Sequence, residues 1–153
     1  MLLKFQFDGL AIRRTLINVA TLALTALLSS CSEDPTNEMK FKADIADQGA
    51  GRVELIATIT NLSAATQTLS EIDVDVALHK ALQLTTINGL SPQFIPFDNT
   101  MSYTINRIMG PGETFSLHLY GNKIGYFMTG DVDFVVNNDN FNFRSIAVSC
   151  CVE

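Results

Sequence analysis

The run Ile72-Asp73-Val74-Asp75-Val76-Ala77-Leu78-His79 alternates side chains more regularly than any other part of this 153-residue chain. One of its two faces is wholly aliphatic, and a period of two is typical of a strand with one buried face. Buried parallel strands instead appear as continuous apolar runs. We therefore expect residues 72–79 to form one strand of an antiparallel sheet.

The same alternation recurs on both sides of this run, with β-branched and aromatic residues enriched. Between the alternating segments lie residues that favour turns, such as Asn88-Gly89 and Gly110-Pro111-Gly112. No segment after Cys31 carries an apolar stripe at helical spacing. The sequence predicts an all-β fold, an antiparallel two-sheet sandwich of about seven or eight strands, with strands near residues 41–45, 53–60, 72–79, 82–84, 103–105, 115–120, 132–136 and 141–148.

The last predicted strand changes phase along its length. Phe141 and Phe143 are odd-numbered, whereas Ile146 and Val148 are even-numbered. A slip of one residue turns side chains to the other face of a sheet unless a bulge absorbs it. We therefore expect a bulge or bend near Arg144-Ser145.

The amino-terminal region has the three-part layout of a secretory signal. Three basic residues precede an apolar stretch at residues 16–28, which is followed by Ser29 and Ser30. Thirteen residues are too few to cross a bilayer, which needs about 20. We expect residues 1–30 to be a signal peptide.

The motif Leu28-Ser29-Ser30-Cys31 resembles the lipobox of bacterial lipoproteins. The resemblance implies that a lipid is attached to Cys31, that the chain is cleaved before it, and that two or three acyl chains hold the protein on a bilayer. Ser32 is not the aspartate associated with inner-membrane retention, so the family rule points to the outer membrane, facing the periplasm or the cell surface. Residues 31–38 are polar and acidic, as in a flexible tether, which leaves residues 39–153 as one domain.

A second resemblance concerns the predicted sandwich. The order of Asn61-Leu62-Ser63 after one strand and Gly110-Pro111-Gly112-Glu113 before another is similar to that in bacterial immunoglobulin-like and fibronectin-like domains. The hallmark tryptophan and the intersheet cysteine pair are absent. This resemblance implies an immunoglobulin-like architecture and no particular function.

Charge argues against nucleic acid as a partner. After residue 30 the chain holds seven Lys and Arg against fifteen Asp and Glu. An acidic surface of this kind is repelled by phosphate backbones and by anionic lipid headgroups.

Two apolar segments are candidates for a contact surface, and they contain Phe94, Phe97 and Phe127. The ordinary interpretation is that these side chains plug the ends of the sandwich. The sharper hypothesis is that they form an exposed patch that docks an envelope protein.

Evidence for catalysis or for a resident metal is slight. His79 and His118 fall in phase with the polar faces of their strands, where solvated imidazoles are expected, and no nucleophile or metal-protease motif occurs. Asp73 with Asp75, and Asp131 with Asp133, each place two carboxylates on one strand face, which calcium could use. Alternating aspartates more often prevent pairing at sheet edges. We expect no enzyme, no cofactor and no metal site, with calcium or small-molecule binding as the alternative.

Cys150 and Cys151 are adjacent, which is unlike a disulfide framework. Neighbouring Cα atoms lie about 3.8 Å apart, below the usual range for a bridge. We expect Cys150 to be buried and Cys151 to be exposed, where Cys151 could join a second copy of the chain in a disulfide-linked homodimer. Taken together, the sequence predicts a lipid-anchored, non-enzymatic protein-binding or structural module of the envelope.

Overall fold

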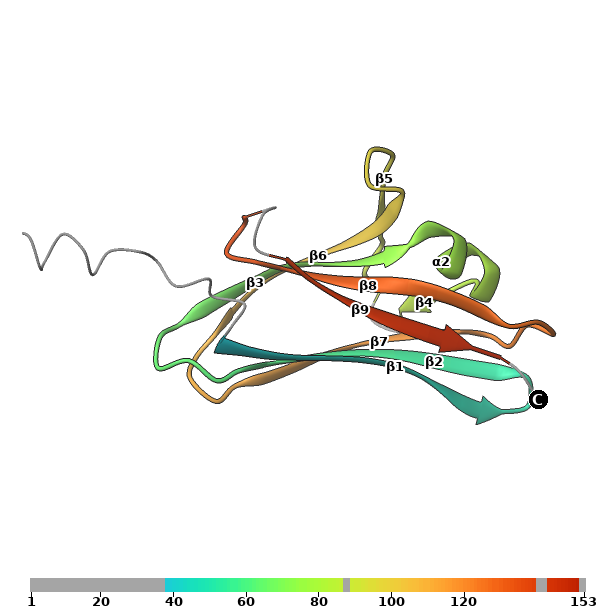
Figure 1. Cartoon of the computed structure of the whole chain (residues 1–153), viewed down its shortest axis with the longest axis horizontal. Helices are drawn as coiled ribbons and strands as arrows, with labels where there is room; N and C mark the ends of the chain where they lie inside the picture. Colours follow the sequence, from blue (N-terminus) through green and yellow to red (C-terminus); the bar gives the residue numbers. More distant parts are fainter. Residues whose placement is uncertain (1–37, 87–88, 140–142, 152–153) are drawn as a thin grey trace, which may run out of the picture. The chain divides into compact units, whose positions relative to one another are not determined.

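The computed structural model describes residues 38–86, 89–139 and 143–151. Its strands form two antiparallel sheets that pack face to face as a sandwich (Figure 1). The four-stranded sheet has the order β1-β2-β7-β4 and the five-stranded sheet the order β5-β6-β3-β8-β9. The bounds are β1 Met39–Gly49, β2 Arg52–Asn61, β3 Gln67–Asp75, β4 Thr85–Thr86, β5 Gln93–Ile95, β6 Thr100–Met109, β7 Thr114–Asn122, β8 Met128–Val136 and β9 Phe143–Cys150, with one helix, α2 Val76–Leu82.

The two antiparallel sheets confirm the predicted β-sandwich. The short strand β5 and the long strand β6 add to the free edge of β3. The count exceeds the expected seven or eight because β4 and β5 are very short pieces.

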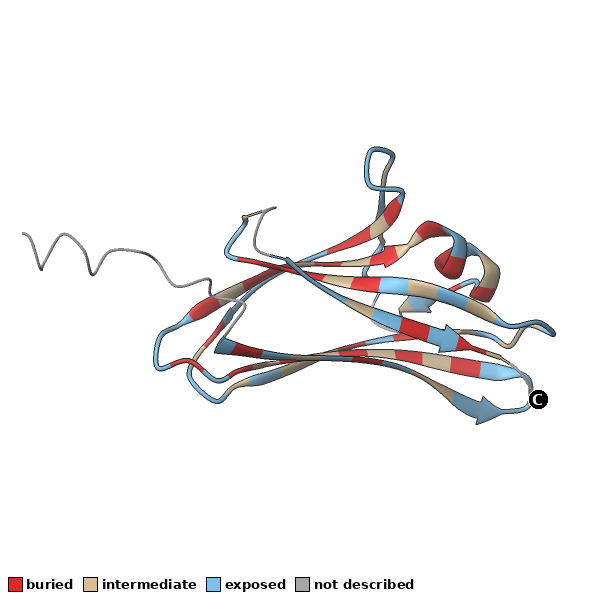
Figure 2. Ribbon diagram, in the orientation of Figure 1, coloured by how far each residue is buried: buried red, intermediate tan, exposed pale blue. Residues whose placement is uncertain are grey.

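Alternating side chains build the core between the sheets (Figure 2). In β2 the odd-numbered residues from Val53 to Ile59 are buried, as the pattern predicted. They face Ile72, Val74 and Phe134 of the other sheet within one cluster, and Phe41 meets Phe134 at a ring-centroid distance of 5.2 Å. Burying one such side chain stabilises the fold by about 1.5–3 kcal/mol.

Asn61 ties two turns together at one end of the sandwich. Its side-chain amide donates to the carbonyl oxygens of Ala65, Met109 and Gly110 at 2.9–3.2 Å, and its side-chain oxygen accepts from Ser63. Asn61 is fully buried, so each polar atom needs such a partner. This network explains why the asparagine that ends β2 and the glycine turn before β7 occur together in the sequence.

The run 72–79 is a strand for only half its length, which corrects the prediction. The Asp75 carboxylate accepts hydrogen bonds from the backbone N–H groups of Ala77 and Leu78, at 2.7 and 3.2 Å, and so begins α2. The helix ends at Leu82, and the following residue, Gln83, caps it with a left-handed backbone. The short strand expected at residues 82–84 is therefore the end of a helix instead.

Two glycines let α2 lie against the sheets. A side chain at Gly121 of β7 would collide with the carbonyl oxygen of Leu82, and one at Gly130 of β8 would come within 2.9 Å of the Leu78 side chain. Larger residues at these positions would push the helix away.

The bulge expected near Arg144-Ser145 is also wrong. The pairing of β8 with β9 runs without a shift from Met128↔Cys150 to Val135↔Phe143. Phe143 simply points outward while Ile146 and Val148 point inward, so no change of phase is needed. The register shifts instead lie at Asp47/Gly49 and Leu69/Glu71. Phe141 falls outside the described residues.

Candidate functional site

A row of polar side chains crosses the outer face of the five-stranded sheet. The register places Asp73 of β3 directly beside Asp133 of β8. The row continues outward on both sides through Ser102, Gln93 and Ser145. Like charges directly opposite each other destabilise a sheet, so this pair is unusual for a purely structural surface.

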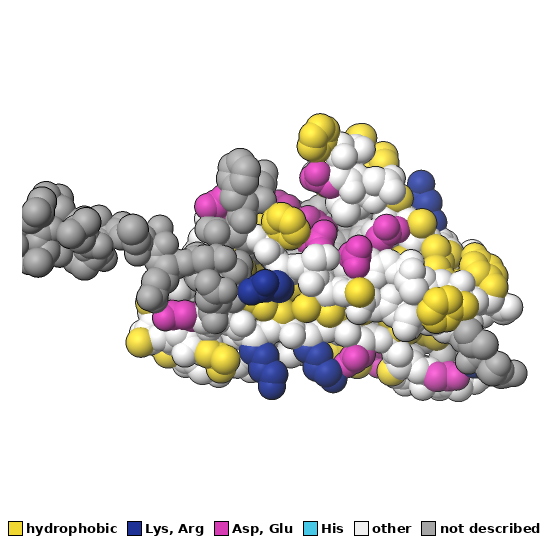
Figure 3. Space-filling model, viewed as in Figure 1, with side chains coloured by type: hydrophobic (Ala, Val, Ile, Leu, Met, Phe, Trp, Pro, Cys, Tyr) yellow, Lys and Arg dark blue, Asp and Glu magenta, His cyan; other side chains and the backbone are white. Residues whose placement is uncertain are grey.

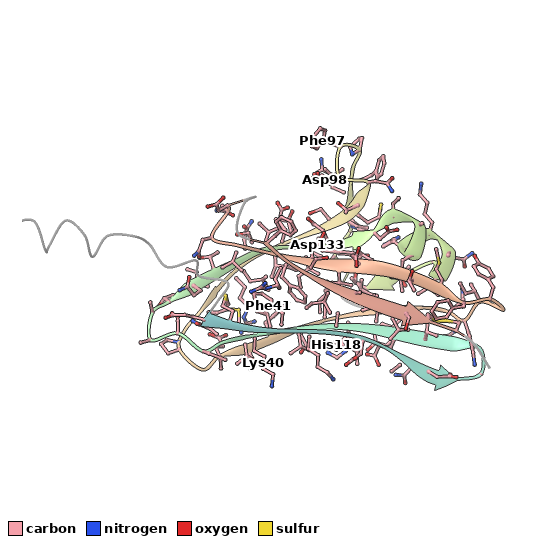
Figure 4. All side chains as sticks on the ribbon, in the orientation of Figure 1. Lys40, Phe41, Phe97, Asp98, His118 and Asp133 are labelled. Atoms are coloured by element: carbon pink, nitrogen blue, oxygen red, sulfur yellow. A yellow bond between two sulfur atoms is a disulfide. The ribbon has the colours of Figure 1, made fainter. Side chains whose placement is uncertain are left out.

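The two aspartates lie on the floor of a hollow of about 670 Å³. Its acidic members also include Glu71 and Asp98. Phe97 and Asp98 lie on the raised turn between β5 and β6, on the same side of the sheet as Asp133 (Figure 4). Acidic side chains gather below this raised turn in the space-filling view (Figure 3). We name this feature the acidic hollow.

The walls of the acidic hollow are largely apolar. They consist of Ile95, Phe97, Val135 and Phe143, with the hydroxyl-bearing Thr100 beside them. Phe97 is 97% exposed and Phe143 is 52% exposed, so aromatic rings border the opening. The site therefore combines negative charge at its base with apolar walls.

Burial and neighbouring charges disturb the titration of both aspartates. Loss of solvent contact, reinforced by the charges of Glu71, Asp133 and Asp98, raises the pKa of Asp73 to about 6. The pKa of Asp133 is also raised, first by burial and then by the charges of Asp131, Asp98 and Asp75. Hydrogen bonds from the Ser102 hydroxyl to Asp73 and from the Ser145 hydroxyl to Asp133 oppose these shifts and offset them only in part.

Three buried oxygen atoms of the hollow have no hydrogen-bond partner among the described residues. They are Oδ1 of Asp73, Oδ1 of Asp133 and Oγ1 of Thr100. The nearby Ser102 hydroxyl donates to Glu71 at 3.1 Å. An unsatisfied buried acceptor costs about 1–3 kcal/mol, so the hollow is ready to accept hydrogen bonds from a donor.

Such a carboxylate pair can hold a proton, bind a cation or serve as an acid and base. Neither His79 nor His118 is among the residues that line the hollow. No three His, Cys, Asp or Glu side chains within residues 38–86, 89–139 and 143–151 converge as a metal site requires. Chemistry at this site therefore rests on carboxylates and one hydroxyl.

The three phenylalanines of the predicted patch are all exposed but are divided between two places. Phe97 borders the acidic hollow, and Phe94 on β5 lies under the Lys80 ammonium, 5.5 Å from the ring centroid. Phe127 lines a separate hollow of about 510 Å³ with Tyr126 and Cys151. The acidic hollow and the Phe127 hollow share no lining residue.

The histidines do not both lie on the surface, which corrects one prediction. His79 is buried on α2, and its Nε2 lies 2.7 Å from the Tyr103 hydroxyl. Burial, and then the charge of Lys80, lowers the pKa of His79. His118 is exposed on the opposite sheet, as expected, with Nδ1 2.7 Å from Glu54.

The cysteines at the carboxyl end are joined to each other. Cys150 is buried, as expected, but Cys151 is half-buried and forms a disulfide with it, so the prediction of an exposed thiol at Cys151 is wrong. Cys151 would thus have to leave this bridge before it could join a second chain.

Cys31, at which lipid attachment is predicted, lies outside the described residues, as do the predicted signal peptide at 1–30 and nearly all of the predicted tether at 31–38. Within the described part of the chain, no helix has the length and apolar character needed to cross a membrane.

The sequence did not single out Thr100, Ser102 or Asp98 as members of a site. A signal was present, because Thr100 and Ser102 alternate with the apolar residues Met101 and Tyr103. The sequence does not show the register between β3 and β6, which brings Thr100 and Ser102 to the neighbourhood of Asp73.

No protein-family model matches this chain, and no curated protein matches it. Among solved structures, it is similar to the GH20 exo-β-N-acetylglucosaminidase from Vibrio harveyi in complex with N-acetylglucosamine, with 12% identity and a TM-score of 0.41. That match covers 72% of this chain and 17% of the enzyme, and an inactive mutant of the same enzyme gives the same values. The apo PCuAC domain from PmoF1 matches with 9% identity and a TM-score of 0.36, over 76% of this chain and 95% of that domain. At these values the similarity carries no argument about what this chain binds.

Proposed function

We propose that this chain is a lipid-anchored, non-enzymatic module that binds an envelope protein through the acidic hollow and its aromatic border. The observation that carries the proposal is the position of Phe97. Its ring is 97% exposed on a raised turn, beside a hollow whose base is charged and whose buried oxygens lack partners. Aromatic side chains are enriched at protein–protein interfaces relative to the rest of the surface.

The anchoring part of the proposal rests on the sequence. Basic residues, a short apolar stretch and Leu28-Ser29-Ser30-Cys31 follow one another in the order of a lipoprotein signal. Acyl chains at Cys31 would hold the sandwich at an outer membrane, facing the periplasm or the cell surface.

Anchoring is tested by mass spectrometry of the amino-terminal peptide and by alkaline washing of membranes. The expected result is an acylated Cys31 and release of a Cys31→Ser variant from the membrane. Retention of Met1 in the native protein, or a Cys31→Ser variant that stays equally embedded, would contradict the proposal.

Partner binding is tested by crosslinking in intact cells, followed by mass spectrometry. We expect Phe97→Ser to reduce capture of one envelope protein several-fold without lowering the melting temperature, because the ring is almost fully exposed. Leu62→Ser is the matched control, since Leu62 is also exposed, at 64%, and is not among the residues that line the hollow. Unchanged capture by Phe97→Ser, or equal loss with Leu62→Ser, would contradict the proposed surface.

A second candidate function is binding of a small molecule or calcium. The specific observation in its favour is the apposition of Asp73 and Asp133, since carboxylate oxygens are the ligands that hard cations prefer. Stabilisation of the full chain by calcium chloride, lost in Asp133→Asn, would support this candidate over the first.

A further inference from the structure

The acidic hollow lacks a counter-charge of its own. No lysine or arginine is among the described residues that line it. Lys80 lies over Phe94, Arg107 pairs with Glu113, and Lys42 pairs with Asp44 on the other sheet. Among the described residues that line the hollow, none is basic, so a bound cation would find unpaired negative charge on Asp73 and Asp133.

The buried oxygens specify what that molecule has to supply. Thr100 is only 8% exposed, and its hydroxyl oxygen has no hydrogen-bond partner among the described residues. One oxygen of each aspartate is buried in the same way. An ionised carboxylate only accepts hydrogen bonds, so the missing partner is a donor, and an ammonium or guanidinium group carries three to five N–H donors in one place.

The walls of the hollow favour an organic cation over a bare metal ion. Ile95, Val135 and Phe143 offer apolar contact above the charged base, and no described group of three acidic, His or Cys side chains is suited to a metal. Lysine and arginine have this construction, with an apolar stem and a charged head. Aromatic rings at the border add cation–π attraction, a contact that Lys80 already makes with Phe94.

We propose that the acidic hollow receives the cationic head of a lysine or arginine side chain presented by the partner, with Asp73, Asp133 and Thr100 accepting its hydrogen bonds. This inference rests on the proposed function for the existence of a protein partner, and it adds the chemistry by which that partner is recognised. Phe97 and Phe143 border the stem, and the charged head lies at the base.

Binding depends on pH because the base must be ionised. The groups that face Asp73 are Glu71, Asp98 and Asp133, and those that face Asp133 also include Asp131 and Asp75. All of them are acidic, so raising the pH adds negative charge and strengthens binding of a cation. A contact made only by the apolar walls would not respond to pH in this way.

The test is a nuclear magnetic resonance titration of the full chain with blocked tripeptides. Acetyl-Gly-Lys-Gly-amide and acetyl-Gly-Arg-Gly-amide are the probes, and the norleucine tripeptide is the neutral control of equal length. We expect the basic peptides to shift the backbone amides of Asp73, Thr100 and Asp133 with at least fivefold higher affinity than the norleucine peptide. We also expect weaker binding at pH 5 than at pH 8.

Variants locate the interaction. Asp73→Asn and Asp133→Asn should each weaken binding of the lysine peptide at least fivefold, whereas Asp44→Asn on the outer face of the other sheet should not. Thr100→Val should weaken it about threefold, and Thr58→Val on the other sheet serves as its control. Unfolding does not confound the first pair, because removal of one of two apposed charges relieves repulsion.

Four outcomes would overturn the inference. They are equal affinity for the lysine and norleucine peptides, full binding by Asp73→Asn, displacement of the peptide by calcium chloride alone at lower concentration, and tighter binding of free n-butylammonium than of either basic peptide. The last two would assign the hollow to a metal ion or to a small amine. Such results leave the Phe97→Ser crosslinking test unaffected, so failure of this inference and failure of the proposed function are distinguishable.

Discussion

The outer faces of the two sheets differ in how many of their polar side chains have a partner. On the four-stranded sheet, Lys42 pairs with Asp44, His118 pairs with Glu54, and the hydroxyls of Thr58 and Ser116 lie 2.9 Å apart. On the five-stranded sheet, Asp73 lies opposite Asp133, and three buried oxygens have no partner among the described residues. Lys40 and His118 point away on the side opposite to Phe97, Asp98 and Asp133 (Figure 4).

The apposed aspartates and the buried oxygens without partners make the outer face of the five-stranded sheet the less stable of the two. Both faces belong to one sandwich, and the five-stranded sheet also has polar contacts, such as the hydrogen bond from Ser102 to Glu71. The apposed Asp73 and Asp133 nevertheless have no basic partner among the described residues that line the hollow. Sequences usually satisfy their local rules together and depart from them at functional sites. The unpaired face is therefore the better candidate for binding.

The largest expected effect comes from removal of one charge of the apposed pair. Asp73→Asn should raise the free energy of unfolding at pH 7 by about 1–2 kcal/mol, because each pH unit by which a pKa moves is worth about 1.4 kcal/mol and partial solvent screening reduces the total. Thermal unfolding measures it, with a rise of several degrees in melting temperature expected.

The sign of the pH dependence follows from linkage. The pKa of Asp73 is raised from 3.8 to about 6, so the folded state holds a proton that the unfolded state has released between these values. Stability contributed by this group is complete below pH 4 and is lost as the pH rises through 6. The gain in free energy of unfolding caused by Asp73→Asn should therefore be present at pH 7 and disappear near pH 3.5. A gain that is the same at both pH values would contradict the assignment of the effect to the Asp73 charge.

A smaller effect with opposite signs on the two faces is expected for threonine hydroxyls. Thr58→Val should destabilise by about 1 kcal/mol because it removes one partner of a hydrogen bond. Thr100→Val should be neutral or stabilising by up to about 1 kcal/mol, because its buried hydroxyl has no partner to lose among the described residues. Denaturant unfolding measures the free energy of unfolding of both variants. Equal destabilisation by Thr58→Val and Thr100→Val would contradict the predicted difference between the two faces.

The smallest effect concerns the contact between His118 and Glu54 on the four-stranded sheet. Glu54→Gln should cost no more than about 0.5 kcal/mol, and the cost should shrink in high salt, since the partner His118 is exposed to solvent. The hydrogen bond from His118 is the first cause that lowers the pKa of Glu54, so the loss should be present above about pH 4.5 and fade as the pH falls through the lowered value. A loss of several kcal/mol would contradict this prediction, because it would mean that the contact between His118 and Glu54 contributes much of the stability of the fold.

The sandwich could be predicted from sequence because its strands repeat a simple rule. Residues 53–60 and 115–120 place every second side chain in the core, and the structure buries those of β2. Helix α2 was missed because Val76 and Leu78 fit a period of two as well as they fit a short helix. The available signal was Asp75, an N-cap residue followed by helix-forming residues.

The acidic hollow could be predicted only in part. Asp73 and Asp133 were both identified as carboxylates on strand faces, but nothing in a single sequence sets the register between strands so far apart. That register makes them neighbours, and the turn between β5 and β6 then brings Asp98 to the same place. The Thr100 hydroxyl lacks a hydrogen-bond partner among the described residues because of this packing, and no pattern in the neighbouring sequence predicts it.

The most direct test of the binding site is a carbon-13 titration of the Asp73 carboxyl in the full chain. We predict a midpoint near pH 6, which moves to lower pH when the lysine tripeptide is added, because the bound cation favours the ionised form. A midpoint near 3.8 that does not respond to the peptide would contradict it.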